Sequence, residues 1–412
     1  MKDKKSGSSI DLKFLMRALR SRNFRLYFFG QAVSLTGVWM QQIAMSWLVY
    51  RLTNSVFMLG LVGFAGQIPS LFFMPIAGIF ADRWNRQRIL VVTQIMAMVQ
   101  AFILVFLLVA GVAVVWHIFV LSIVLGIINA IEAPVRQAFI LEVVGKKEDL
   151  GNAIALNSMV FHGARLVGPS IAGIVVAAAG EATCFFVNGV TFLAVIFALL
   201  AMKFAPRKKI ERTTGVVQEL KDGFRYTFGS VQIRSILLLV STVSLMGISY
   251  AVLMPVFARD IFKGGPKLLG IMMGASGLGA LIGSFFLASR KDMHGLKKNI
   301  ITSVYILGSA LVVLAFSRML WISFIALIFV GFGMMVQMAS SNTFIQMIVE
   351  DAKRGRVMSF FTLAFLGVMP FGSLLAGWLS SRMGATVTLF ICGVCCILGS
   401  LIFSKKILDT GE

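Results

Sequence analysis

Apolar stretches of about 20 residues, the length that a helix needs to cross the hydrocarbon core of a bilayer, follow one another along nearly the whole chain. Of the 412 residues, 58% are hydrophobic and only 13% are charged, a balance outside the range of soluble domains. The connectors leave no room for a soluble catalytic domain. We therefore expect an all-α membrane protein with twelve transmembrane helices, at 26–49, 56–80, 89–111, 117–140, 151–178, 183–203, 234–257, 268–288, 299–316, 320–348, 357–381 and 385–404.

The basic residues are distributed unequally between the two sides of the predicted membrane. Of the 38 Lys and Arg residues, 31 lie in the N-terminal arm, in the tail, or in the connectors that follow even-numbered spans and the span ends beside them, whereas six lie in the other connectors. Basic connectors stay in the cytoplasm, so we expect both termini there. This distribution accounts for the net charge of +21 without nucleic acid, and membrane lipid is the expected anionic partner.

One connector is much longer than the others and divides the chain into two sets of six spans. The predicted organisation is an N-terminal arm (1–25), a first bundle (26–203), a cytoplasmic linker (204–233), a second bundle (234–404) and a tail (405–412). The stretch 133–143 can also be aligned with 339–349, which indicates a weak repeat of the two bundles.

The connector between the second and third spans carries the strongest local motif, Gly78 followed by Asp82, Arg83 and Arg86. It resembles the signature of the major facilitator superfamily, which implies two six-helix bundles related by an axis along the membrane normal. A glycine allows close helix packing, and Asp82 can pair with Arg83 or Arg86. These residues are therefore candidates for a gate that latches the cytoplasmic side. The alternative is an ordinary basic loop.

The fifth span contains Gly168, Pro169 and Gly173, and this element is similar to one in the drug/proton antiporters of the same superfamily. Proline bends a helix by removing a backbone hydrogen bond, so these residues are further gating candidates. Stretches 23–27, 37–41, 47–50, 133–139 and 152–158 resemble the enterobactin-exporter branch, which includes macrolide efflux proteins. The resemblance implies a bacterial inner-membrane exporter that uses the proton gradient and needs no cofactor.

Charged side chains inside spans are costly, at about 2.5–3.5 kcal/mol near the bilayer centre. Glu132 lies inside the fourth span, with Arg136 one turn later on the same face. We expect Glu132 to be the proton-coupling carboxylate; a structural Glu132–Arg136 brace is the alternative. Arg165 and His162 lie together on the fifth span. They could hold an anionic part of the substrate or tune Glu132, or Arg165 could simply be capped by backbone carbonyls.

In the superfamily, spans 1, 4, 7 and 10 line the substrate cavity. The resemblance therefore implies a set of substrate-binding amides and hydroxyls, to which span 2 adds one residue: Gln41, Gln42, Gln67, Asn129, Tyr250, Gln337, Asn342 and Gln346. Methionines near them offer adaptable apolar surface. This mixture favours a bulky amphiphilic small molecule, siderophore-like or drug-like.

The leading hypothesis is a monomeric exporter of such a molecule by proton antiport. A lysophospholipid transporter or flippase on the same fold is the close alternative, and an intramembrane enzyme or channel is a distant one. The sequence has no paired catalytic acids, no metal-ligand motif, no repeated pore loop and no phosphate-binding loop. These absences make an enzyme and an ATP-driven pump the least favoured classes.

Overall fold

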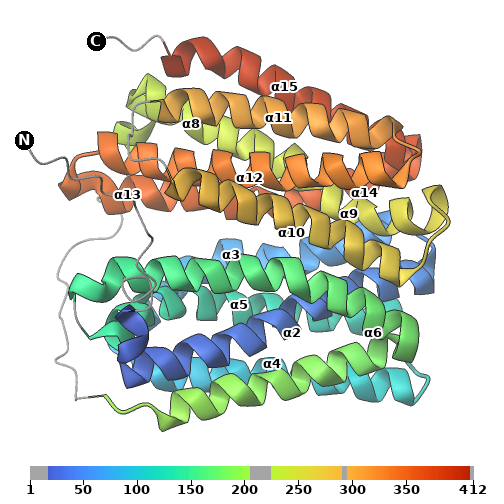
Figure 1. Ribbon diagram of the computed structural model, residues 1–412, viewed down its shortest axis with the longest axis horizontal. Coiled ribbons are helices and arrows are strands. Elements are labelled where there is room, and N and C mark those ends of the chain that lie inside the picture. The colour runs from blue at the N-terminus through green and yellow to red at the C-terminus, as the bar shows by residue number, and fades with distance from the viewer. Residues whose placement is uncertain (1–16, 146, 205–223, 290–294, 409–412) are drawn as a thin grey trace, which may run out of the picture.

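The computed structural model describes residues 17–145, 147–204, 224–289 and 295–408, and within these residues the chain is helical with no β-strand. Ten helical segments among them are long and apolar enough to cross a membrane. One is the 52-residue α6 (Leu150–Ala201), which is interrupted at Gly180 by backbone angles of φ 80° and ψ 172°. Glycine adopts a positive φ without steric cost. The chain doubles back there, so 150–179 and 181–201 run as two antiparallel lengths (Figure 1).

The first half of the chain contains five long helical elements. Besides α6 they are α2 (Arg22–Thr53), α3 (Val56–Arg83), α4 (Arg86–Val109) and α5 (Val115–Val144). Side-chain caps begin two of them, because Ser21 accepts a hydrogen bond from the backbone of Phe24 and Asn85 from that of Arg88. Two short 3₁₀ turns, η1 (Arg17–Arg20) and η2 (Lys147–Asp149), precede α2 and α6.

The second half is less regular, because three short π-helical segments interrupt its helices. The first long element is continuous through α8 (Val231–Thr242), η3 (Val243–Gly247), α9 (Tyr250–Val256) and η4 (Phe257–Ile261). The remaining helices are α10 (Pro266–Ala288), α11 (Leu296–Phe316), α12 (Leu320–Ile348), α13 (Asp351–Thr362), η5 (Leu363–Gly367), α14 (Met369–Met383) and α15 (Ala385–Leu408). The five-residue spacing of a π turn is visible in the bond from the Ile248 N–H to the Val243 carbonyl, at 3.0 Å.

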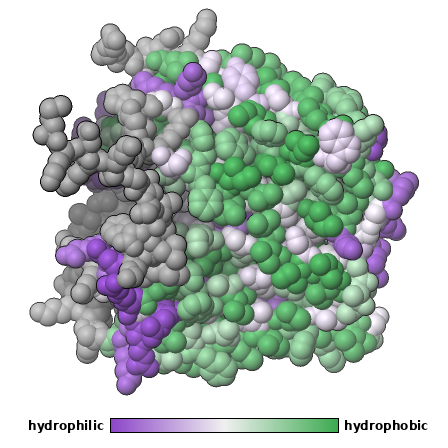
Figure 2. Space-filling model, in the orientation of Figure 1, coloured by the Kyte–Doolittle hydropathy of each residue, from purple (hydrophilic) through white to green (hydrophobic). Residues whose placement is uncertain are grey.

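The two halves lie side by side as two layers of helices (Figure 1). We call the end at which α2 begins and α15 ends the basic end, and the end that contains Asn54 and Gly180 the far end. The halves meet chiefly where α6 packs on α10 and where α3 packs on α14. On the face shown in Figure 2, hydrophobic residues cover the middle and hydrophilic residues gather at the two ends, as expected for a surface in contact with lipid.

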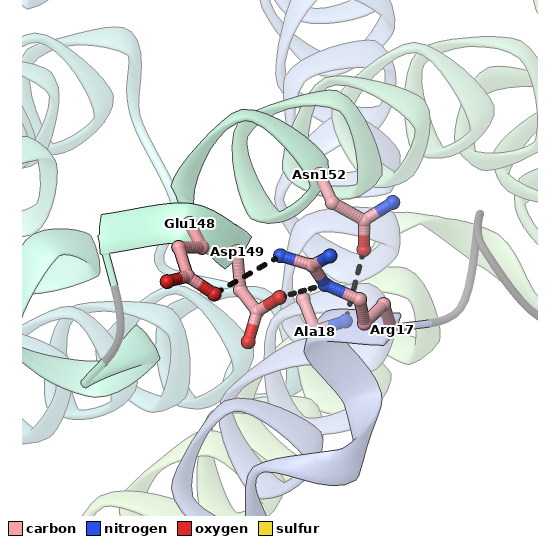
Figure 3. Close-up of polar contacts among 5 residues, drawn as sticks. All are labelled: Arg17, Ala18, Glu148, Asp149 and Asn152. Carbon is pink, nitrogen blue, oxygen red and sulfur yellow. Dashed lines mark hydrogen bonds and ion pairs between the residues drawn. The ribbon is translucent and has the colours of Figure 1, made fainter.

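At the basic end, the start of the described chain is attached to the beginning of α6 (Figure 3). Arg17 forms an ion pair with Asp149 and lies 4.0 Å from Glu148. The backbone N–H of Ala18 donates to the side-chain oxygen of Asn152 at 2.9 Å. These contacts tie η1 to the connector between α5 and α6, and so fix the entry of the chain into the first half.

Candidate functional site

A cavity of about 470 Å³ lies between the two halves. Its volume is within the range of sites for small molecules. Helices α2, α3 and α5 supply much of the wall, with contributions from α4, α6, α9, α10 and α14. The predicted residues that line it are Gln41, Gln42, Gln67, Asn129, Glu132 and Arg136.

Glu132 combines burial with an ion pair. Its carboxylate lies 3.7 Å from the Arg136 guanidinium, one turn along α5, and only 11% of its side chain is exposed. The side chain of Gln94, on α4, lies near the same carboxylate. The buried Tyr27 hydroxyl lies near both charges and has no hydrogen-bond partner among the described residues. A carboxylate on a cavity wall with one cation beside it can gain or lose a proton when the cavity changes shape.

The adjacent glutamines Gln41 and Gln42 have different surroundings. Gln41 is buried, donates to Gln100 at 3.0 Å and accepts from Asn188 at 2.6 Å. These bonds tie α2 to α4 and α6, so Gln41 holds the first half together although it also borders the cavity. Gln42 is exposed, as is Asn129 on α5, and neither has a hydrogen bond within the described part of the chain. Gln42 and Asn129 are therefore two exposed amides that are available to a ligand.

Four predicted binding residues of the second half do not line this cavity. Tyr250 is buried and shares a hydrogen bond of 2.6 Å with Ser276 on α10. Gln337 is buried and donates to a serine one turn later on α12, at 3.3 Å. Asn342 and Gln346 bond to each other on the same helix. The hydrogen bonds of these four side chains are formed with one another or with other residues of the second half, so the structure does not bring them to the site.

Arg165 lies at the contact between the halves, near the middle of the membrane-spanning length. Its guanidinium is 5.6 Å from the centre of the Trp39 ring, and one of its nitrogens is 3.7 Å from the Met334 sulfur on α12. Trp39 and Phe161 border the cavity, whereas Arg165 does not. His162 is buried one turn earlier, and its Nδ1 has no hydrogen-bond partner among the described residues. The structure thus keeps Arg165 and His162 together but shows no ion pair between either and Glu132.

The glycines of the fifth predicted span are packing contacts. A Cβ at Gly168 would lie 2.6 Å from Trp39 Cβ, so this glycine lets α6 approach α2 within the first half. A Cβ at Gly173 would lie 2.7 Å from the Pro266 carbonyl oxygen and 3.0 Å from Gly270 Cα, so this glycine lets α6 approach α10 across the halves. Pro169 lies buried between them inside a continuous helical stretch.

Polar contacts at the far end join the halves, and the sequence alone did not single them out. The Tyr50 hydroxyl, at the end of α2, donates to the Asp260 carboxylate on η4. Arg259 donates to the Asn54 side chain at 2.8 Å and lies over the Tyr50 ring at 5.5 Å. The sequence signal for these contacts is weak, because the adjacent Arg259 and Asp260 in a connector are typical of solvent-exposed surface.

The motif between the second and third predicted spans is only partly described. The backbone of α3 is helical through Arg83, but the side chains of Asp82 and Arg83 and the surroundings of Gly78 lie outside the described part of the chain. Arg86 is buried at the start of α4, where it donates to Glu142 at 2.8 Å and to the Ala138 carbonyl at 3.2 Å. Arg86 thus braces α4 against α5 at the basic end.

A helical membrane protein whose two halves enclose a central cavity is the architecture of a major facilitator transporter. Over residues 16–412 the chain matches the family described as transmembrane secretion effector, and it belongs to that family of major facilitator transporters. It is 27% identical to the staphyloferrin A transporter of Staphylococcus aureus, over 92% of this chain and 94% of the relative. It is 26% identical to the multidrug efflux pump Tap of Mycolicibacterium fortuitum, over 84% of this chain and 86% of that one.

Solved structures agree on the fold. A bacterial homologue of the human lysosomal transporter Spinster, in an inward-facing and occupied conformation, matches with a TM-score of 0.71 and 14% identity, over 94% of this chain and 96% of that one. The nucleoside transporter NupG matches with a TM-score of 0.70 and 15% identity, over 95% of this chain and the whole of the other. At these identities the likeness extends to the fold alone.

Proposed function

We propose that this transporter is a secondary exporter that moves a bulky amphiphilic small molecule across a bacterial inner membrane by alternating access. The observation that carries the proposal is the cavity between the halves, which contains amides, an ion pair and apolar side chains together. Relatives named for siderophore transport and for multidrug efflux support an organic cargo of this kind. Dividing α6 at Gly180 and adding α2 brings the ten apolar segments to twelve, which supports the proposed bundles 26–203 and 234–404 on either side of the proposed linker 204–233.

The arrangement of contacts supports a state that is closed at the far end. Among the described residues, polar side-chain contacts between the halves lie at the far end (Tyr50–Asp260 and Arg259–Asn54) and near the middle (Gln67–Ser373 and Arg165–Met334). By the positive-inside rule the basic end faces the cytoplasm. The cargo would then enter the cavity from the cytoplasm and leave when the far end separates. Asp82 and Arg83 remain the proposed latch that closes the basic end in the other state.

Glu132 is the proposed coupling group. In the ionised form it pairs with Arg136, and protonation removes the charge on which that pair depends. A proton arriving from outside would therefore release Arg136 and change the cavity wall at the moment when cargo leaves. Arg165, with His162 one turn earlier on α6, is the proposed positive group at the contact between the halves that tunes this exchange.

The test is flux in proteoliposomes with an imposed pH gradient, using a catecholate siderophore and a macrolide as cargo. We expect Glu132→Gln to abolish gradient-driven flux and to leave equilibrium binding of the cargo intact. The matched control is Glu181→Gln, because Glu181 is also buried and ion-paired, with Arg51 at 2.7 Å, but does not border the cavity. Gradient-driven flux at the wild-type rate in Glu132→Gln would refute the coupling role.

A further inference from the structure

The two halves present unlike walls to the cavity. Every side chain that the second half contributes is apolar except that of Ser373. Val252 and Met273 are among these apolar side chains. The first half contributes amides, serines and the Glu132–Arg136 ion pair in addition to apolar groups. The polar residues of the second half that the sequence favoured are bonded elsewhere. A ligand in this cavity therefore meets hydrogen-bonding groups on one side and chiefly hydrocarbon and sulfur on the other.

The exception in the second half, Ser373, is already engaged. Its hydroxyl oxygen accepts a hydrogen bond from the Gln67 amide at 3.5 Å, and its O–H donates to the Met369 carbonyl at 3.4 Å. Both bonds are longer than the usual range for such contacts. They nevertheless use the donor and an acceptor of the hydroxyl, which leaves the second half little polar capacity to offer a ligand.

Gln42 and Asn129 of the first half are in the opposite situation. Both side chains are exposed, both border the cavity, and neither has a hydrogen bond within the described part of the chain. A polar side chain on a membrane-spanning helix is retained at a cost, and it usually faces a partner or a cavity. A primary amide offers two donors and one acceptor oxygen. The ion pair beside them compensates its own charge, so the available groups suit an uncharged head.

We propose that the cavity fixes the orientation of its cargo. An uncharged polar head that carries both a donor and an acceptor, such as an amide or hydroxyl group, lies against Gln42 and Asn129 of the first half. The apolar body lies against Val252 and Met273 of the second half. This inference rests on the proposed function only in taking the cavity as the transport site.

The test uses three probes with one apolar body: 1-pyrenebutyramide, 1-pyrenebutyrate and the headless 1-butylpyrene. Equilibrium binding is measured for the full chain in lipid nanodiscs without any gradient. Partition into lipid is measured for each probe in nanodiscs without protein and subtracted, so preferences among probes and ratios between variants both report the protein. We expect the wild type to bind the amide more tightly than both other probes. Gln42→Met should reduce the preference for the amide over the headless probe about tenfold, as expected for the loss of one or two hydrogen bonds.

The reciprocal substitution Met273→Gln is the matched control, because Met and Gln are unbranched side chains of similar length. It should weaken all three probes alike and leave the preference for the amide unchanged. Asn129→Leu provides a second polar-wall variant if Gln42→Met does not fold. A wild-type preference for the carboxylate or for the headless probe, no saturable binding of any probe, or equal loss of head preference in Gln42→Met and Met273→Gln would each overturn the proposal. Because no gradient is applied, failure of proton coupling would leave this result standing.

Discussion

Gly173 offers a direct test of the contact between the halves. A Cβ there would lie 2.7 Å from the Pro266 carbonyl oxygen, 3.0 Å from Gly270 Cα and 3.1 Å from Lys267 Cα, whereas ordinary contacts are 3.4–4 Å. All three neighbours are backbone atoms, so none can move aside by changing a rotamer. Gly173→Ala should therefore force α6 and α10 apart by about 0.7 Å at this point.

The energetic cost follows from the packing. Forcing a methyl group into a closely packed contact costs about 1–3 kcal/mol. If separation of the far end relieves this cost, the equilibrium between the two states shifts by about 5- to 140-fold toward the separated state, since each 1.4 kcal/mol is a factor of ten. Gly163→Ala is the control. It makes the same change ten residues earlier on α6, at a position where a Cβ would meet nothing within 4 Å.

The assay is the distance between spin labels placed at Ala178 on α6 and Lys263 before α10, both exposed at the far end. The labels require a background without the four native cysteines. We expect Gly173→Ala to populate longer distances and Gly163→Ala to match the parent protein. An unchanged distance distribution in Gly173→Ala, or an equal shift in both variants, would show that the glycine contact does not control separation of the halves.

Three further changes follow from individual contacts. Tyr50→Phe removes the bond to Asp260, a hydrogen bond to a charged group worth about 1.5–3 kcal/mol, and should lengthen the same label distance; the idea fails if the distance does not change. Arg165→Ala should leave 1-pyrenebutyramide binding nearly unchanged but weaken any anionic cargo strongly, and the reverse order would place the head beside Arg165. Arg17→Ala breaks a partly exposed pair with Asp149 and should lower the free energy of unfolding by no more than about 1 kcal/mol; a larger loss in denaturant unfolding would mean that this attachment organises more of the fold.

Hydropathy predicted the helices well because burial in lipid depends on composition. The predicted span 320–348 coincides with α12, and 56–80 differs from α3 only at its end. The reversal predicted between 178 and 183 is present as a single glycine inside a long helical stretch, since Gly180 turns the chain without a loop. The π segments of the second half were not predicted, because no residue type demands them.

The cavity was harder to predict than the helices, because a uniformly apolar helix gives no signal of which face is turned inward. Gln41 and Gln42 are equivalent in the sequence, yet neighbouring residues on a helix point about 100° apart. One therefore bonds within the first half, and the other is exposed at the cavity. The same rotation explains why Tyr250 and Gln337 bond within the second half. Isolated amides in apolar spans, such as Gln94 and Asn188, were the available signal for the polar network, but their partners depend on packing.

The π segments on either side of Tyr250 give the second half a degree of freedom that the first half lacks in its described residues. A π turn holds about one residue more than an α turn, so a π turn that migrates along its helix rotates the residues it passes by about 100°. The stretch 248–256 lies between η3 and η4 and includes both Tyr250 and the cavity residue Val252. Migration of either segment would exchange the face that this stretch turns to the cavity while the helix axis stays in place. The apolar character of the cavity wall formed by the second half thus depends on the helical register of 248–256, and a different register would turn Tyr250 toward the cargo.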